Sequence, residues 1–222
     1  MKRLADSLYL LGGIPPYAIN VYLAGDVLID AGAKFATRRI LRQLRGQTVR
    51  AHALTHAHPD HQGASHDVCR ALDIPLWCGE ADADAVEDTD LIIERLPQNW
   101  VNRNIGRYFM GPAHPVSRRL REGDEVGGFT VIETPGHSAG HVAYWRASDR
   151  TLIMGDVLCN MNIWTGVPGL HEPQLMYTID PRRNRESARQ LARLEPALIC
   201  FGHGPPLRDT AKFLRYVAAL PD

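Results

Sequence analysis

The amino-acid sequence predicts an α/β protein in which two β-sheets pack face to face and helices cover them on the outside. Two observations support this class. Short β-type segments predominate in both halves of the 222-residue chain, and helical segments are interspersed among them. Two packed sheets with outer helices bury the apolar faces of all these elements. At this length and with 45% apolar residues, we expect a single domain spanning residues 1–222.

In the first half, short apolar segments bounded by turn residues are typical of strands. Strands are expected at residues 8–11, 19–23, 27–30, 49–54 and 75–78. A helix is expected over 37–44, because apolar residues recur there at helical spacing and Gly46 follows as a stop. A second helix is expected over 65–72.

In the middle of the chain, residues 81–121 mix Asn, Pro, Gly and aromatic residues. We expect an insertion with weak helices there that caps a substrate site. Asp180 and Pro181 are typical of a helix N-cap and first turn, and they predict a helix to about residue 194. The remaining elements are strands at 129–133, 142–145, 152–154 and 197–201 and a last helix at 210–220.

The charge pattern gives no support for a nucleic-acid partner. The chain has 25 basic and 25 acidic residues, and its arginine clusters are short enough to be solvated helix faces or loops. The N-terminal segment lacks the features of a signal peptide, and no stretch approaches the roughly 20 apolar residues of a membrane span. The four cysteines are scattered, which favours reduced, buried thiols. We therefore expect a cytoplasmic protein that acts on a small molecule away from membranes.

The densest group of chemically reactive residues follows the strand at 49–54. The string T-H-A-H-P-D-H, residues 55–61, combines three histidines with an aspartate. Three later strand ends each add one residue of the same kind in a glycine-flanked loop: His137, Asp156 and His203. Loops at strand ends commonly carry function on a rigid scaffold, and the glycines allow tight turns that let these side chains converge.

These residues are suited to binding metal ions. Histidine and aspartate together favour zinc or another first-row divalent ion, whereas calcium prefers oxygen ligands almost alone. Seven ligands are too many for one tetrahedral ion, so we expect two ions, with iron or manganese as alternatives to zinc. The ligands divide into two half-sites and a bridge: His56, His58 and His137; Asp60, His61 and His203; and Asp156 between them.

The motifs T-H-A-H-P-D-H, P-G-H, G-D and G-H-G, in this order, resemble those of the metallo-β-lactamase superfamily. The resemblance covers essentially the whole chain. It implies an αββα sandwich, that is, two mixed sheets flanked by helices, with the metal ions at one edge of the sheets. It also implies the same seven ligands. Such motifs identify a fold and metal-dependent chemistry, but a fold does not identify a substrate.

The resemblance further implies a dinuclear hydrolase that cleaves a small ester, thioester or lactone through a hydroxide bridging the two ions. Asp60 is expected to orient the attacking water and accept its proton. Tyr177, if it lies in the pocket, is expected to donate a hydrogen bond to the carbonyl oxygen; an ordinary half-buried tyrosine is the alternative. Glyoxalase II has the most similar motif set, but residues 204–222 contain no counterpart of its C-terminal helical domain. Glutathione thioesters are therefore not carried over.

Two other functions stay open at this point. One is a mononuclear iron oxygenase similar to persulfide dioxygenase, with His56, His137 and Asp156 as a facial triad. The other is a metal-stabilised binding protein, which predicts a closed set of ligands with no position for water. The substrate pocket is expected to include Trp164 and His171, in and beside the loop after Asp156. Neither the substrate nor the oligomeric state follows from the sequence.

The remaining histidines are expected to have structural roles. His52 lies within a predicted strand, so we expect it in the core or beside the metal ligands. Structural or surface positions are expected for His66, His114 and His141.

Overall fold

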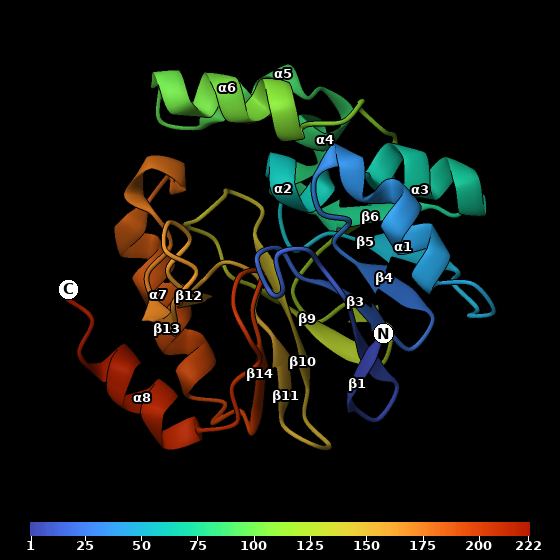
Figure 1. Cartoon of the computed structure of the whole chain (residues 1–222). Helices are drawn as coiled ribbons and strands as arrows, with labels where there is room; N and C mark the ends of the chain where they lie inside the picture. Colours follow the sequence, from blue (N-terminus) through green and yellow to red (C-terminus); the bar gives the residue numbers. More distant parts are fainter.

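Two β-sheets face each other in the computed structural model of the protein, and helices cover both outer faces (Figure 1). The structure describes residues 1–222, apart from the side chains at positions 101, 103, 105 and 107. The predicted αββα sandwich is confirmed by this layering. The two sheets contribute their inner faces to one core, while the helices complete two outer cores.

The first sheet has seven strands in sequence order. They are β1 (Lys2–Ala5), β2 (Leu8–Leu11), β3 (Val21–Ala24), β4 (Val27–Ile29), β5 (Ala51–Ala53), β6 (Leu76–Gly79) and β7 (Val116–Leu120). The pairs from β1 to β4 are antiparallel, whereas β4, β5, β6 and β7 pair in parallel. Parallel strands end at the same edge of a sheet, so the loops that follow β4, β5 and β6 lie at one edge.

The second sheet has five strands in the order β14-β11-β10-β9-β8. Their bounds are β8 (Glu125–Val126), β9 (Phe129–Glu133), β10 (Val142–Arg146), β11 (Thr151–Ile153) and β14 (Leu198–Cys200). Only the β11–β14 pair is parallel, so this sheet is mixed as well. A separate hairpin, β12 (Cys159–Met161) and β13 (Pro168–His171), follows β11 in the chain.

Eight α-helices and three short 3-10 helices surround the sheets in the described chain. The α-helices are α1 (Thr37–Gln43), α2 (Pro59–Gln62), α3 (Ser65–Leu72), α4 (Ala83–Glu87), α5 (Asp90–Arg95), α6 (Trp100–Phe109), α7 (Pro181–Ala192) and α8 (Thr210–Ala218). The 3-10 helices are Lys34–Ala36, Glu80–Asp82 and Leu175–Tyr177. In Figure 1, α1 and α3 lie outside the first sheet and α7 and α8 outside the second.

The core between the sheets is built from large buried side chains of both. Tyr22 and Ile29 from the first sheet meet Phe129, Tyr144 and Ile153 from the second. Burying a side chain of this size stabilises the fold by about 1.5–3 kcal/mol. On the outer faces, α1 and α3 contribute Ile40 and Val68 among others, and α7 and α8 contribute Leu191 and Phe213. The sheets are therefore held from both sides, which leaves their edges to carry loops.

Most predicted elements are present, with ends that differ by one or two residues. The helix over 65–72 and the strand over 129–133 have the predicted bounds. The structure adds β1, β8 and the β12–β13 hairpin, which were not predicted because these strands are very short and carry polar or glycine residues.

The expected irregular segment 81–121 is only partly irregular. It holds α4, α5 and α6, but its end is β7, an edge strand of the first sheet. The exposed face of β7 carries Ser117 and Arg119, so the strand lacks the run of apolar residues by which a buried strand is predicted from sequence. The capping role of the helical part stays a prediction.

Two further expectations concern the chain as a whole. The four cysteines are all buried and free, as predicted. Among the helices of the described residues, none combines the length and the apolar character that crossing a membrane requires.

His52, on β5, is a buried histidine outside the predicted ligand set. Its Nδ1 atom lies 3.1 Å from the Leu28 carbonyl oxygen, and its Nε2 atom lies 2.8 Å from Ser65 Oγ. The carbonyl can only accept, so Nδ1–H donates to it and Nε2 accepts from the Ser65 hydroxyl. Burial lowers the pKa of His52 to about 4.

This burial predicts an acid-sensitive contribution to stability. Above the unfolded pKa of about 6.5, His52 is neutral in both states and adds no pH dependence. Between that value and about 4 the unfolded chain takes up the proton first, so the free energy of unfolding falls by about 3 kcal/mol. His52→Gln should reduce the difference between urea unfolding free energies at pH 7 and pH 4 by about this amount. Equal pH differences in the variant and the wild type would contradict the assignment.

Candidate metal centre

All seven predicted ligands lie close together, although they come from four separate loops. His56 and His58 follow β5, and Asp60 and His61 lie in the first turn of α2. The other three follow β9, β11 and β14: His137, Asp156 and His203. Because β11 and β14 are parallel neighbours, their loops leave the second sheet at the same edge.

The beginning of α2 explains why one short string supplies four of these residues. His58 has an extended backbone and precedes Pro59, which occupies the first turn of α2. Proline is favoured there because its φ angle is helical and its missing N–H would have no partner. The chain therefore changes from an extended to a helical path between His58 and Asp60, and this change sends the two halves of the string toward different partners.

The possible ligand atoms form three groups in the structure, and two of these groups have the membership expected for the two half-sites. The nitrogens of His56, His58 and His137 lie within 4.8 Å of one another. In the second half-site, the ligand atoms of Asp60, His61 and His203 also lie within 4.8 Å of one another. A third group, His56, His61 and Asp156, overlaps both.

Asp156 lies between the two half-sites. Its Oδ2 atom is 3.6 Å from His137 Nε2 in one half-site. The same oxygen is 3.6 Å from His61 Nε2 and 3.1 Å from His203 Nε2 in the other. One carboxylate oxygen is therefore near imidazole nitrogens of both half-sites.

Two of the histidines are oriented through Asp30, at the end of β4. The Nδ1 atom of His61 lies 2.9 Å from Asp30 Oδ2 and donates to it. Thr55 Oγ1 donates to the same carboxylate oxygen over 2.9 Å, so it accepts the hydrogen bond from His56 Nδ1. These bonds place the proton on Nδ1 and aim Nε2 of both rings at the centre.

His137 and His203 are held in the same way by other partners. Thr178 Oγ1 donates to the Gln174 carbonyl and therefore accepts from His137 Nδ1, 3.1 Å away. His203 Nδ1 donates to the Ala18 carbonyl oxygen. In four of the five candidate histidines the Nε2 atom is thus the one available to a metal ion.

Asp82 joins two of the loops that carry ligands. Its carboxylate accepts hydrogen bonds from the Ala57 N–H over 3.0 Å, from Ser138 Oγ over 2.6 Å and from the Gly140 N–H over 2.7 Å. The loop of His56 and the loop of His137 therefore have a fixed separation. Sequence reasoning missed both Asp82 and Asp30. A buried acid directly after the apolar strand of β4 was the available signal for Asp30, whereas Asp82 has no comparable signal.

His141, for which a structural or surface role was expected, is a buried support of the centre. Its Nε2 atom accepts from the Asp156 N–H over 3.1 Å, and Nδ1–H donates to Thr134 Oγ1 over 2.7 Å. Its ring stacks on His56 with 5.0 Å between centroids. His66 and His114 contact each other away from the centre, as expected for structural positions.

The polar atoms of the centre fit divalent metal ions. Buried atoms without a hydrogen-bond partner include His56 Nε2, His137 Nε2 and Asp156 Oδ1. Such atoms cost about 1–3 kcal/mol each unless a partner is supplied. The Nε2 atoms of His61 and His203 lie 3.4 Å apart. Two nitrogens at about 2.0–2.1 Å from one tetrahedral ion are separated by about 3.3–3.4 Å.

Charges within the centre differ between the two half-sites. Burial lowers the pKa of His61, but the surrounding carboxylates, led by Asp156, outweigh it and raise this pKa to about 10. Burial and the neighbouring imidazoles hold the pKa of His56 and of His137 well below the usual value. A divalent ion in the half-site of His61 therefore competes with the proton on that imidazole. The affinity of this half-site for the ion rises with pH.

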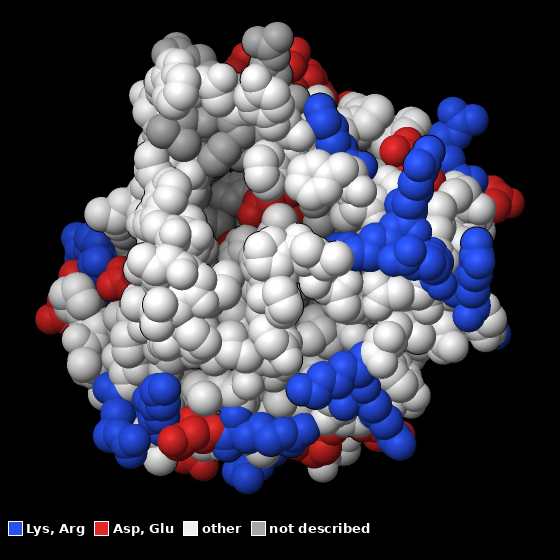
Figure 2. Space-filling view, in the orientation of Figure 1, with Lys and Arg blue, Asp and Glu red and all other residues white. Residues whose placement is uncertain are grey.

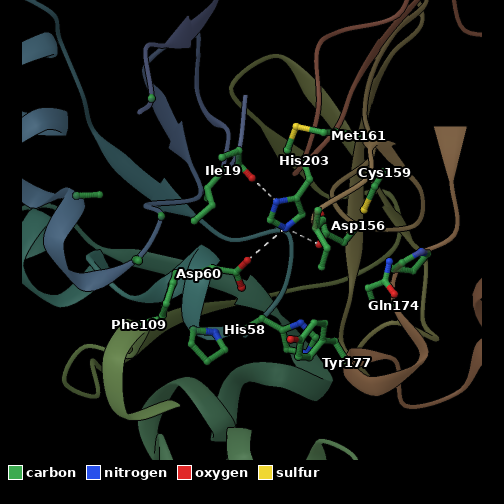
Figure 3. A pocket seen from close by; sticks show the side chains of 18 of the residues that line it. Ile19, His58, Asp60, Phe109, Asp156, Cys159, Met161, Gln174, Tyr177 and His203 are labelled. Carbon is green, nitrogen blue, oxygen red and sulfur yellow. Dashed lines mark hydrogen bonds and ion pairs between the residues drawn. The ribbon is translucent and has the colours of Figure 1, made fainter. Parts of the chain in front are cut away.

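A cavity of about 550 Å³ opens onto the centre. His58, Asp60, His137, Asp156 and His203 line it, and Figure 3 shows Asp60 and Asp156 directed at His203. Figure 2 shows a hollow in this face with acidic side chains at its base. The centre is therefore open to a ligand of appreciable size.

The cavity wall includes one of the residues expected beside the substrate and not the other two. Trp164 and His171 are not among the lining residues of the described chain, and Trp164 is 63% exposed. Their chain neighbours Ile163 and Glu172 line the cavity instead. The reason is that the turn between β12 and β13 carries Trp164 outward. Tyr177 does line the cavity, half-buried, and burial followed by the charge of Asp60 raises the pKa of its phenol.

Gly202 shows how tightly the loops are packed around Asp156. A Cβ atom at this position would lie 1.9 Å from Asp156 Oδ1 and 2.7 Å from His61 Cε1. No side chain fits there without displacing the carboxylate. Gly155, on the other side of Asp156, has a φ of +54° and serves the tight turn predicted for it.

Comparisons with known proteins agree with this architecture. The family model described as "Metallo-beta-lactamase superfamily" matches residues 14–203, which include all seven candidate ligands. "Probable metallo-hydrolase YybB" of Bacillus subtilis (strain 168) is 29% identical over 193 residues, covering 86% of this chain and 81% of YybB. A solved structure of TTHA1623 "in a di-iron-bound form" is 31% identical, with a TM-score of 0.63 and 92% of each chain covered.

A "Hydroxyacylglutathione hydrolase" of Bdellovibrio bacteriovorus is 26% identical over 166 residues. The match covers 73% of this chain but only 51% of that protein. The chain thus spans about half the length of this relative.

Gly202→Ala should weaken metal binding while the fold persists. The added methyl group displaces Asp156, and disturbing the surroundings of metal ligands typically reduces affinity about 10- to 100-fold. Metal content after dialysis against a competing chelator measures the effect, and circular dichroism checks the fold. Gly12→Ala is the matched control, because its Cβ atom has an ordinary contact of 3.5 Å. Unchanged metal affinity in Gly202→Ala would contradict the packing argument.

Proposed function

Because the chain belongs to the metallo-β-lactamase superfamily, we propose that it is a dinuclear metal-dependent hydrolase of a small ester, thioester or lactone. One observation carries the proposal. The ligand atoms form two groups of three, and the Asp156 carboxylate lies between the groups. A single ion needs only one such group, whereas two ions use all seven residues.

Zinc is the proposed metal, with iron or manganese as alternatives. Imidazole and carboxylate ligands suit all three ions. The similar protein TTHA1623 has been described in a di-iron-bound form, which supports iron as an alternative in this fold. When bound, two divalent ions would lower the pKa of coordinated water and stabilise negative charge on the carbonyl oxygen.

Asp60 and Tyr177 are the proposed catalytic side chains. The Asp60 side chain is 25% exposed at the cavity, and the imidazoles of His61 and His203 outweigh the effect of burial and keep its pKa low. Its ionised carboxylate is placed to orient an attacking water and accept its proton. The raised pKa of Tyr177 keeps its phenol protonated at neutral pH, so the phenol can donate to the carbonyl oxygen of a substrate.

The substrate is proposed at the level of its reactive bond. Similarity to a hydroxyacylglutathione hydrolase supports hydrolytic chemistry on a thioester. The similarity covers only half of that protein, so glutathione itself is not part of the proposal. The balanced charge of the chain supports a small molecule over nucleic acid, and the cytoplasmic location stays a prediction.

The iron oxygenase is less well supported by the grouping of the ligands. Its facial triad of His56, His137 and Asp156 would leave His58 and the entire second half-site without a role. A metal-stabilised binding protein is also disfavoured, because it requires a closed set of ligands. Five of the seven candidate ligands, among them Asp60 and Asp156, line an open cavity of about 550 Å³.

Removal of metal should abolish hydrolysis of small esters, thioesters and lactones, and two equivalents of zinc should restore it. In the loaded protein, Asp60→Asn should reduce kcat about 100-fold or more, because general acid–base catalysis contributes at least that much. Asp67→Asn, which removes an exposed carboxylate on α3, is the matched control and should have no effect.

Initial rates with a panel of such substrates provide the measurement, together with metal analysis. Inactivity of the fully loaded protein across the whole panel would contradict the hydrolase. About one iron per chain, with oxygen consumption on a persulfide, would establish the alternative instead.

A further inference from the structure

The cavity has a charged residue that the proposed reaction does not use. Apart from the candidate metal ligands, the charged residues that line it in the described chain are Arg39 and Glu172. Glu172 is neutralised by Arg185, whose Nε atom lies 3.0 Å from its carboxylate, and both side chains are mostly buried. Arg39 therefore provides the unbalanced charge of the wall.

The Arg39 guanidinium has N–H donors that form no hydrogen bond within the described chain. Arg39 lies in the first turn of α1 and is half-buried. Its Nη1 atom donates to the Gly12 carbonyl oxygen, and its tip lies beside Gly13 and Gly32, which both line the cavity. Among the described residues no carboxylate forms an ion pair with it. A guanidinium has five N–H donors, so most of them are available to a ligand.

Burial makes this lack of a partner significant. Burial lowers the pKa of Arg39, and no neighbouring acid counteracts the effect. A partly buried, unpaired cation is unfavourable unless an anion joins it. Other basic side chains gather over α1 beside the hollow (Figure 2). Arg38 on the same helix is exposed and lies outside the cavity, so it serves as a comparison.

We propose that Arg39 binds a carboxylate of the substrate, remote from the bond that is cleaved. The proposal rests on the hydrolase function and narrows it to esters, thioesters or lactones that carry an anionic group. Arginine is suited to this role because its planar fork matches a carboxylate with two parallel hydrogen bonds. Ile19, Phe35 and Phe109 line the same cavity as Arg39 and the ligands, and they supply apolar surface for the carbon chain of the substrate.

A matched pair of esters tests the proposal. The two share one alcohol and one acyl chain length, but one acyl chain ends in a methyl group and the other in a carboxylate. Wild-type protein should prefer the carboxylate ester, and Arg39→Gln should reduce the ratio of the two kcat/KM values about 10- to 100-fold, mainly through KM. Arg39→Lys should restore part of the ratio. Arg38→Gln removes one charge from the same helix and should leave the ratio unchanged.

Two outcomes would overturn the proposal. One is a wild-type protein without preference for the carboxylate ester. The other is an equal loss on both esters in Arg39→Gln, which would show that the residue only anchors the Gly12 loop. The corresponding ketones, in which a methylene group replaces the ester oxygen, cannot be hydrolysed. Calorimetric binding of these ketones tests Arg39 even if neither ester is cleaved, so a failure of the hydrolase function remains distinguishable.

Discussion

The buried carboxylate of Asp156 is the constraint on which the rest of the structure depends. Its Oδ2 atom lies within 3.6 Å of imidazole nitrogens from three separate loops. An ionised carboxylate is costly to bury unless partners compensate it, so the fold must bring those loops together. The parallel pairing of β11 with β14 does this for Asp156 and His203, and the bare backbone of Gly202 permits the close approach.

Hydrogen bonds from residues around the ligands fix the orientation of the imidazole rings. Asp30 directs two imidazoles at once, one directly and one through Thr55, while Asp82 fixes the distance between two ligand loops. These two aspartates position the candidate metal ligands. Arg39 and the apolar residues of the cavity wall lie on other elements than these aspartates. Substitutions in that wall can therefore change substrate selectivity without disturbing the ligands.

The sequence predicted the centre well because its ligands are marked locally. Five of the seven lie directly beside a glycine or proline, and the other two, His56 and His61, belong to the same short string after β5. Each of the seven is a member of at least one of the observed groups. Asp82 was not predicted, because its partners lie 25 to 58 residues away in the chain. Trp164, expected in the substrate pocket, is exposed in the turn of the β12–β13 hairpin, and the direction of such a turn depends on strand pairing that no local pattern encodes. The strand β7 was missed for the related reason that an edge strand exposes polar residues.

Anomalous diffraction from crystals of the zinc-loaded protein tests the central claim most directly, because it locates each ion independently of activity. Two peaks are predicted. One should lie among His56, His58 and His137, the other should lie among Asp60, His61 and His203, and Asp156 should contact both. A single peak at full zinc loading, or peaks outside these two groups, would contradict the dinuclear centre.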